Sequence, residues 1–259
     1  MRQKRSTGFE MTIWLCEEFT IFRSMFPLPA HRTKDVSPLI YPLTPSNTVY
    51  ITQKSPLNSI STGTTLYLSS QLLAHYAQTV TPRGTRAIEL GAGTGLVSIA
   101  LGIMGWEVWT TDLWNVIDDV LQTNIERNRE DTTGTITIQE LDWCQENWDW
   151  KYPDDTLSKE APEWDLILCA DGIYDMQLIP PLLRTLQTLS GDRSPVILLA
   201  FERRDTAVID SFFEQSKPLG FVSKKVNLRR ILGRQIARWG WTPEDWHSIE
   251  IWTMRLKSL

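Results

Sequence analysis

The sequence predicts an α/β fold with a mostly parallel central sheet and helices on both faces. From Arg86 onward, apolar segments of strand length alternate with segments of helical period, a pattern typical of such a sheet. Some of these segments, such as Val196–Ala200, are continuously apolar, so we expect their strands to be buried on both faces. A glycine-rich segment, Gly91–Gly95, joins one strand to the next helix, as in α/β proteins that bind nucleotide-like ligands.

The strands and helices can be placed in order from this alternation. A helix-like pattern from Leu66 to Tyr76 leads into the first strand. The last two strands have no obvious helix between them, so we expect a C-terminal antiparallel hairpin, with an inserted loop or short helix at Asn227–Ser248. The expected strands are Ala87–Leu90, Glu107–Thr111, Thr135–Leu141, Asp165–Ala170, Pro195–Phe201, Phe221–Val226 and Ile249–Arg255, and the expected helices are Leu96–Met104, Val116–Arg129, Leu178–Leu189 and Val208–Gln215.

Residues 1–60 differ in composition from the rest of the chain. They are rich in Pro, Ser and Thr, lack helical periodicity and contain β-type pieces at Met11–Trp14 and Val49–Thr52. We expect residues 1–60 to form an N-terminal extension, a hairpin or an arm laid on a main domain of residues 61–259.

Composition narrows the classes of function. The formal net charge of −5 gives no general electrostatic reason to bind nucleic acid. Arg229, Arg230, Arg234 and Arg238 form either a local basic patch or the solvated face of a helix. No stretch approaches the ~20 apolar residues that cross a membrane. We therefore expect a monomer without membrane or direct nucleic-acid partners.

The cysteines and histidines do not suggest a metal site or a disulfide framework. The three cysteines are widely spaced and form no C-x-x-C pair. This usage suits a reducing compartment, so we expect the cytoplasm, with the nucleus as the second choice. His75 and His247 stand alone in the sequence and are expected to be structural.

The spacing of the glycines separates two classes of cofactor. Gly91–Gly95 reads G-x-G-x-G, whereas the dinucleotide pattern G-x-G-x-x-G needs a glycine where Leu96 stands. An acid, Glu89, precedes the glycines. A second apolar run ends about 20 residues later at Asp112, where a carboxylate can accept hydrogen bonds from ribose hydroxyls. A plain tight connection is the alternative for this turn, and the two acids favour a ligand site.

Further candidates stand at the ends of the next two strands. Asp142 can accept a hydrogen bond from an adenine amino group, and Trp143 can stack on the ring; a helix cap and a core residue are the alternatives. Asp171 and Tyr174 follow the fourth strand and should border the reacting centre, since ligands bind outside the carboxyl ends of the strands. A helix N-cap and a packed aromatic residue are the alternatives for this pair.

Taken together, these motifs resemble a known family. The acid and glycines of Glu89–Gly95 resemble motif I of the class I methyltransferases, which bind S-adenosylmethionine. The order of Thr62-Gly63, Thr111-Asp112-Leu113, Asn124, Leu141-Asp142-Trp143 and Asp171-Gly-Ile-Tyr174 is similar to the seven-β-strand protein-lysine methyltransferases (family 16) over residues 60–256. That family usually reads T-G-x-x-x-W, and Tyr67 stands at the tryptophan's place here.

The resemblance implies a Rossmann-like, seven-stranded class I methyltransferase sheet. It implies S-adenosylmethionine as the cofactor, S-adenosylhomocysteine as the product, no metal, and a cytosolic protein substrate such as translation elongation factor 1A. Asp171 and Tyr174 are its candidate catalytic residues. Its candidate cofactor-binding residues are Tyr67, Glu89, Gly91, Ala92, Gly93, Thr94, Gly95, Asp112, Leu113, Asp142, Trp143 and Ala170.

Three other functions stay open from the sequence. The same cofactor site would serve a small-molecule N- or O-methyltransferase; a deep closed pocket formed by residues 1–60 would favour that function, and an open groove near Tyr174 a protein substrate. A non-catalytic binding module is the second alternative, against which Glu89, Asp112 and Asp171 argue. A dehydrogenase ranks last, because the third glycine is misplaced and no hydride-transfer residue stands out.

Overall fold

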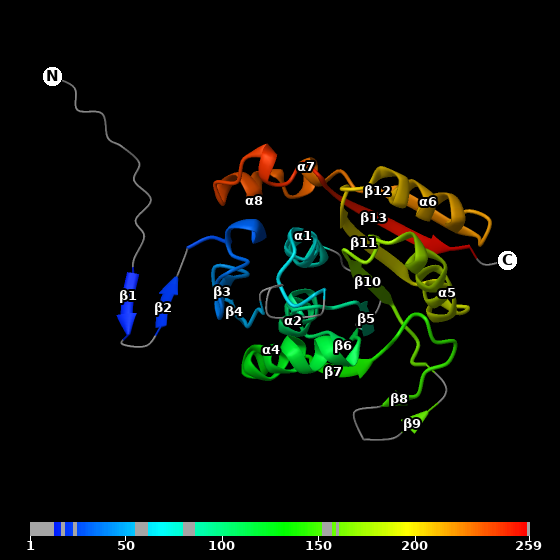
Figure 1. The fold of residues 1–259 in the computed structure, drawn as a ribbon, viewed down its shortest axis with the longest axis horizontal. Coiled ribbons are helices and arrows are strands. Elements are labelled where there is room, and N and C mark those ends of the chain that lie inside the picture. The colour runs from blue at the N-terminus through cyan, green and yellow to red at the C-terminus, as the bar shows by residue number, and fades with distance from the viewer. Residues whose placement is uncertain are drawn as a thin grey trace.

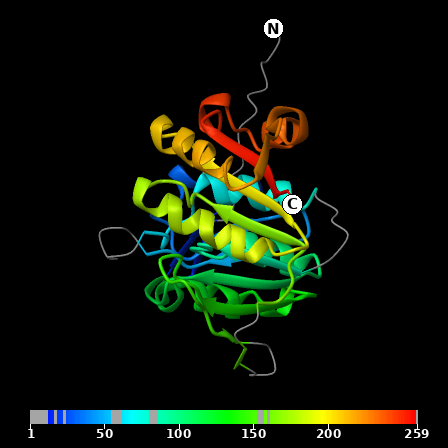
Figure 2. The ribbon, with the colours of Figure 1, turned by 90° about the vertical axis from the view of Figure 1, so that its right-hand side faces the viewer.

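A seven-stranded sheet forms the centre of the protein. The computed structural model describes residues 13–16, 19–22, 25–54, 62–79, 86–151, 157–158 and 161–257. In Figure 2 the strands of the sheet cross the molecule side by side. They are β5 (Arg86–Leu90), β6 (Glu107–Asp112), β7 (Thr135–Glu140), β10 (Leu166–Ala170), β11 (Val196–Glu202), β12 (Phe221–Lys225) and β13 (Ile249–Leu256).

The order of the strands determines where a ligand can bind. It is β12-β13-β11-β10-β5-β6-β7. The strands from β11 to β7 are parallel, and β13 is antiparallel to both of its neighbours, β11 and β12. The predicted mostly parallel sheet with an antiparallel C-terminal hairpin is thus confirmed. The chain leaves β5 toward β6 and β7, then returns to β10 on the other side of β5, and such a switch point opens a crevice at the carboxyl ends of the strands.

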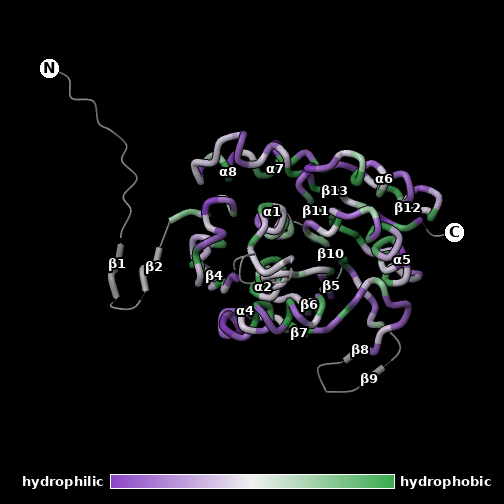
Figure 3. The backbone as a smooth tube through the Cα atoms, in the orientation of Figure 1, coloured by the Kyte–Doolittle hydropathy of each residue, from purple (hydrophilic) through white to green (hydrophobic). Residues whose placement is uncertain are grey.

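Successive residues of the central strands contact different helix layers. Leu166 and Leu168 belong to the apolar cluster that includes residues of the helices α1 (Leu68–Ala77), α2 (Leu96–Ile103) and α4 (Gln122–Arg127). Ile167 and Cys169 belong to the cluster that includes residues of α5 (Ile179–Ser190) and α6 (Thr206–Ser216). All four residues are buried, as expected for a strand covered on both faces. Figure 1 shows α1 and α2 on one side of the sheet and α5 on the other, and in Figure 3 the hydrophobic segments gather at the sheet.

The helices agree with the expected pattern, with one local difference. The segment expected as one helix, Val116–Arg129, begins at the last residue of α3 and continues through a π-helical turn at Ile117–Leu121 into α4. The helices are α1 (Leu68–Ala77), α2 (Leu96–Ile103), α3 (Trp114–Val116), α4 (Gln122–Arg127), α5 (Ile179–Ser190), α6 (Thr206–Ser216), α7 (Leu228–Ile231) and α8 (Gly233–Arg238).

The insertion between β12 and β13 contains α7 and α8, in line with the short helix expected there. Leu228, Leu232 and Ile236 are buried against the apolar cluster of α1. The arginines of the segment, Arg229, Arg230, Arg234 and Arg238, are all exposed. Both interpretations of these arginines, a basic patch and a solvated helix face, require exposure.

The N-terminal part contains two hairpins. Strand β1 (Ile13–Cys16) pairs with β2 (Phe19–Phe22), and β3 (Leu39–Pro42) pairs with β4 (Thr48–Ile51). A further short pair, β8 (Trp150–Lys151) with β9 (Leu157–Ser158), lies between β7 and β10 in the sequence. Of the β-type piece expected at 11–14, residues 11 and 12 lie outside the described part. The predicted domain boundary between residues 60 and 61 lies there too and stays a prediction.

Two buried asparagines, one in α4 and one at its C-terminal end, attach the β4 segment to this helix. Asn124 accepts a hydrogen bond from the Thr52 backbone N–H over 2.7 Å, and Asn128 accepts one from the Tyr50 N–H over 2.8 Å. The Asn124 side-chain amide also donates to the Thr52 carbonyl, and the Asn128 amide donates to the Tyr50 carbonyl. Residues four apart on a helix and two apart on a strand are both about 6 Å apart, so the spacings match.

Within the described residues, no helix is both long and apolar enough to cross a membrane. The same residues contain no group of three or more His, Cys, Asp or Glu side chains placed to hold a metal ion. The expectation of a metal-free site stays a prediction.

Candidate active site

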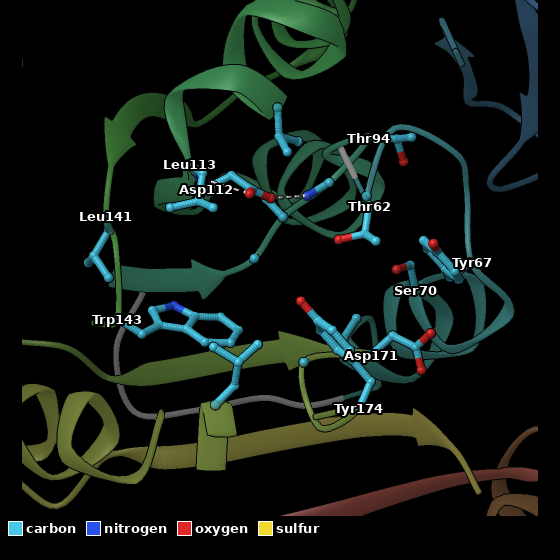
Figure 4. Close-up of a pocket in the computed structure, with 18 of the residues that line it drawn as sticks. Thr62, Tyr67, Ser70, Thr94, Asp112, Leu113, Leu141, Trp143, Asp171 and Tyr174 are labelled. Carbon is cyan, nitrogen blue, oxygen red and sulfur yellow. Dashed lines mark hydrogen bonds between the residues drawn. The ribbon is translucent and has the colours of Figure 1, made fainter. Parts of the chain in front are cut away.

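A cavity of about 410 Å³ opens at the carboxyl ends of β5, β6, β7 and β10. Its volume lies in the range of small-molecule sites, ~300–1,000 Å³. Figure 4 shows Asp112, Leu113, Leu141 and Trp143 at one end, which we call the glycine-turn end, and Asp171, Tyr174, Tyr67 and Ser70 at the other, which we call the Asp171 end. Of the predicted site residues, the lining includes Tyr67, Gly91, Ala92, Gly93, Thr94, Asp112, Leu113, Asp142, Trp143, Ala170, Asp171 and Tyr174.

The turn after β5 is fixed by its backbone. The Ala92 N–H donates to the Thr111 carbonyl over 2.9 Å, which ties the turn to the neighbouring strand. Gly93 has a φ of +56°, and a Cβ at this position would lie 2.8 Å from the carbonyl oxygen of Gly63. Only glycine fits there without strain, because the backbone is left-handed and the Thr62-Gly63 loop approaches closely.

Two predicted site residues, Glu89 and Gly95, are not among the lining residues. Glu89 is fully buried, and its Oε2 accepts hydrogen bonds from the backbone N–H (2.9 Å) and the hydroxyl (2.5 Å) of Ser98 in α2. Burial raises the pKa of Glu89 to about 8. Gly95 precedes α2 with a φ of +80°, and a Cβ there would lie 2.7 Å from the Leu121 side chain. Both residues hold the turn and α2 in place from outside the cavity.

Asp112, at the end of β6, combines structural hydrogen bonds with access to the cavity. Its Oδ2 accepts from the Gly93 N–H and its Oδ1 from the Leu113 N–H, both over 2.8 Å. A carboxylate has about four acceptor positions, so each oxygen can accept one more hydrogen bond from a ligand. Burial raises the pKa of Asp112 to about 6, and these backbone N–H groups oppose the shift.

Trp143 forms a flat apolar wall next to the turn. A Cβ at Gly91 would lie 3.2 Å from its indole ring, and one at Gly172 would lie 3.0 Å from it, so both glycines leave room for the ring. Arg184 donates to the Trp143 carbonyl over 2.8 Å and fixes this loop. The preceding Asp142 accepts a hydrogen bond from the Cys144 N–H over 2.8 Å, which is a local turn and not a helix cap.

Asp171 has an unusual backbone at the other end of the cavity. Its φ of +58° is in the left-handed region, which a non-glycine residue rarely adopts. Its N–H donates to the Ala200 carbonyl over 2.7 Å, and its Oδ1 accepts from the Glu202 N–H over 3.2 Å. The N-cap alternative does not apply, because Asp175 is the residue that caps the 3-10 helix Met176–Leu178.

Tyr174 is not a packed core residue. Its side chain is 52% exposed although it also lines the cavity. It shares a side-chain hydrogen bond with Thr62, which opposes the rise of its pKa caused by burial. The packed-aromatic alternative is therefore excluded.

Arg204 is a site residue that the sequence analysis missed. It follows β11 by two residues, lines the cavity, and donates from Nη2 to Oδ2 of Asp171 over 3.0 Å. Its position just after a strand that ends at the ligand crevice was the available signal. The adjacent Arg203 has the same chemical character in the sequence, so the sequence does not distinguish the two.

A model of the lysine methyltransferase family matches residues 58–218, more than half of the chain. The chain belongs to this lysine methyltransferase family. Similar curated proteins include EEF1A lysine methyltransferase 3 of Xenopus tropicalis, 31% identical over 56% of this chain and 58% of that relative, and its Mus musculus namesake, 31% identical over 64% and 70%. The protein N-lysine methyltransferase METTL21A of Mus musculus is 40% identical over 46% of this chain and 50% of that relative. The chain thus spans little more than half the length of the first relatives it matches.

S-adenosylmethionine is the cofactor of the protein, in line with its membership of the lysine methyltransferase family. The glycine-turn end of the cavity fits this molecule. The turn has no side chain between the backbone and the cavity at Gly91 and Gly93. Asp112 keeps acceptor positions that suit ribose hydroxyls, and Trp143 offers an aromatic face that suits a purine. The cofactor carries no phosphate, in agreement with a lining that relies on acceptors and apolar faces at this end.

Proposed function

We propose that the protein is a protein-lysine N-methyltransferase that transfers a methyl group from S-adenosylmethionine to a lysine side chain of a cytosolic protein. One observation carries the proposal. A single cavity joins the glycine-turn end to Asp171 and Tyr174, and its lining includes the exposed residues Leu113 and Tyr174. The family membership and the names of the relatives support the lysine target.

The rim of the cavity favours a protein as the methyl acceptor over a small molecule. None of the described residues before Thr62 lines the cavity, so the described part of the N-terminal region does not close it. Trp114 is 60% exposed between the lining residues Leu113 and Asn115, and Met176 is 48% exposed between Tyr174 and Leu178. Large exposed apolar side chains such as these are enriched at protein interfaces.

Each part of the lining has a task in this proposal. S-adenosylmethionine supplies an electrophilic methyl group on a positively charged sulfur. Asp112 and Trp143 hold the adenosine part at the glycine-turn end, and the backbone of Gly91–Thr94 approaches it closely. Asp171 accepts a hydrogen bond from the lysine amine, and Tyr174 forms the wall beside it.

The lysine must lose a proton before its nitrogen can act as a nucleophile. The ammonium group has no lone pair, and its pKa in water is about 10.4. The partly buried Asp171 end disfavours the charged form. Holding the amine in line with the methyl group contributes the larger share of the rate, since good positioning is worth ~7–11 kcal/mol.

Translation elongation factor 1A is the first protein to test as the substrate. Two of the relatives have this factor in their names. A substrate of this kind suits the cytosol, which we propose as the compartment.

The proposal is tested by following the label from methyl-labelled S-adenosylmethionine. The purified protein is incubated with a cell extract, and separately with purified elongation factor 1A, and the protein and small-molecule fractions are counted. We expect label in a protein band, which is absent when Asp171→Asn replaces the wild type. Label only in small molecules contradicts the proposal in favour of a metabolite methyltransferase. Binding of S-adenosylhomocysteine without transfer to any fraction contradicts it in favour of a non-catalytic module.

A further inference from the structure

Arg204 connects three elements of the fold at the Asp171 end of the cavity. Its Nη2 donates to Oδ2 of Asp171 over 3.0 Å, and its Nε donates to Oε2 of Glu202 over 2.7 Å. The guanidinium also lies over the Tyr67 ring, 5.7 Å from the centroid, within the range of a cation–π contact. It therefore joins the ends of β10 and β11 to the start of α1 in one fixed position.

The contacts of Asp171 leave it acceptor capacity. Of the roughly four acceptor positions of a carboxylate, the Glu202 N–H occupies one on Oδ1 and Arg204 occupies one on Oδ2. The left-handed backbone and the hydrogen bond to Ala200 fix the direction of the side chain. One position on each oxygen stays open for the N–H groups of a lysine amine.

An unpaired carboxylate at this place would oppose the reaction that we propose. An opposite charge within about 4–6 Å raises the pKa of an amine by about 1–3 units, because it stabilises the ammonium form. The same ammonium proton has to leave to solvent before the nitrogen is nucleophilic. A carboxylate that orients the amine would therefore also hold its proton.

We propose that Arg204 is a positioning residue that fixes Asp171 as a hydrogen-bond acceptor and balances its charge, so that the cavity orients a lysine amine without stabilising its ammonium form. This inference rests on the proposed function. Arg204 acts through Asp171 and contributes no atom to the transferred group. The guanidinium is suited to this task because it stays charged at every physiological pH and donates in a fixed planar geometry.

Other titratable groups surround the Asp171–Arg204 pair. Burial raises the pKa of the Asp171 carboxyl, and the Arg204 guanidinium opposes that shift, so the pair keeps Asp171 available as an acceptor. Titratable and charged groups that interact with Asp171, Arg204 or Tyr174 come from β6, β10, β11 and the segments beside α1 and β10. They are Asp112, Cys169, Glu202, Tyr67 and Asp175.

Arg203 provides a matched control for Arg204. It is the preceding residue and also makes ion pairs, with Glu250 over 2.9 Å and with Asp210 over 3.0 Å. It does not line the cavity. Loss of the Arg203 charge should therefore affect stability without affecting the amine.

The test is the pH dependence of kcat for methyl transfer to the protein substrate, measured from about pH 6 to about pH 10. We compare wild type, Arg204→Gln, Arg204→Met, Arg204→Lys and Arg203→Gln. In the two neutral Arg204 variants, the midpoint of the rise in kcat should move up by about one pH unit, so that turnover lost near neutral pH returns in alkali. KM for the substrate should stay or fall. Arg204→Lys and Arg203→Gln should keep the wild-type midpoint.

One further readout separates positioning from simple damage. The affinity for S-adenosylhomocysteine, measured by calorimetry, should be the same in all five proteins and shows that each is folded. If kcat of Arg204→Gln falls by the same factor at every pH, or if its pH profile matches that of wild type, the inference is overturned while the proposed function stands. A wild-type protein that binds S-adenosylhomocysteine but methylates no lysine overturns both.

Discussion

The two ends of the cavity are built in different ways. The glycine-turn end is built around residues close in sequence, Gly91–Thr94 and Asp112, whose hydrogen bonds join adjacent strands. The Asp171 end is assembled from Tyr67, Asp171 and Arg204, which come from separate parts of the chain. The glycine turn is recognisable as a motif, whereas the contacts of Arg204 that complete the Asp171 end exist only in the folded chain. The difference suggests that the two ends can be disabled separately.

The largest expected effect is at the glycine-turn end, in Asp112→Ala. The change removes an acceptor for ribose hydroxyls and the support of the Gly93 and Leu113 N–H groups. Hydrogen bonds to a charged group are worth about 1.5–3 kcal/mol each, so we expect the affinity for S-adenosylhomocysteine to fall by at least about 100-fold. Calorimetric titration measures this. An affinity within threefold of wild type would remove Asp112 from the cofactor site.

The next largest effect is expected for Asp171→Asn, which changes the Asp171 end of the cavity and leaves the glycine-turn end intact. The variant keeps the shape of the side chain but loses its charge and the ion pair with Arg204. We expect turnover to fall by about 100-fold, as a misplaced reacting group typically costs, with the affinity for S-adenosylhomocysteine nearly unchanged. Steady-state kinetics and calorimetry on the same preparation give both numbers.

Asp175→Asn is the matched control for that experiment. Asp175 lies in the same loop, caps the following 3-10 helix and does not line the cavity. It should keep the wild-type turnover. If Asp171→Asn loses cofactor affinity as strongly as turnover, the two ends are not separable and the comparison fails.

A smaller effect is expected for Gly93→Ala. The new Cβ would lie 2.8 Å from the Gly63 carbonyl oxygen, on a left-handed backbone that costs an L-residue about 1–2 kcal/mol. We expect a loss of about 2–4 kcal/mol in the free energy of unfolding and about tenfold in cofactor affinity. Urea unfolding and calorimetry measure the two.

Gly105→Ala separates the backbone effect from the close approach. Gly105 also has a positive φ, +88°, but a Cβ there would make only an ordinary contact, 3.5 Å from the Thr133 hydroxyl, and the residue does not line the cavity. Its variant should lose only the backbone part, about 1–2 kcal/mol, and no affinity for the cofactor. Equal losses in the two variants would show that the Gly63 approach is unimportant.

The smallest effect is expected for Glu89→Gln. Burial raises the pKa of Glu89 to about 8, so the carboxyl is mostly protonated at neutral pH, and glutamine can still accept from Ser98. We expect the free energy of unfolding at neutral pH to change by less than about 1 kcal/mol. A loss of several kcal/mol would show that the ionised carboxylate supports the turn.

The pH dependence of the same variant has a defined sign. The folded-state pKa of Glu89 is raised above its unfolded value of about 4.3, so its contribution to stability is present below that pH and is lost as the pH rises toward 8. Wild type should therefore lose stability relative to Glu89→Gln across this range. Urea unfolding of both proteins at several pH values in this interval measures the difference, and parallel curves would contradict it.

The order of strands and helices could be read from the sequence because each element has a clear period of apolar residues. The π-helical turn at Ile117–Leu121 could not be, since its apolar residues fit an ordinary helix equally well. The β13 strand follows β12 in the chain but lies between β11 and β12 in the sheet. That arrangement follows from tertiary packing and not from any local signal.

The site was predictable to different depths. Local spacing identified the lining residues from Gly91 to Thr94 and Asp112, and the ends of the next two strands indicated Asp142, Asp171 and Tyr174. The resemblance to a family added Tyr67. Glu89 and Gly95 belong to the same motif but support it from behind, a distinction that requires knowledge of burial. Arg204 has no sequence signal apart from its place after a strand, since its role depends on two contacts across the fold.

The most direct test of the account is the chemical identity of the methylated residue. Protein labelled by the wild type and methyl-labelled S-adenosylmethionine is hydrolysed in acid, and the labelled amino acid is identified by chromatography and mass spectrometry. We expect label in Nε-methylated lysine, lost with Asp171→Asn and kept with Asp175→Asn. Label in methylated arginine or histidine, or label released as methanol by mild base before the hydrolysis, would contradict the assignment of the Asp171 end to a lysine amine.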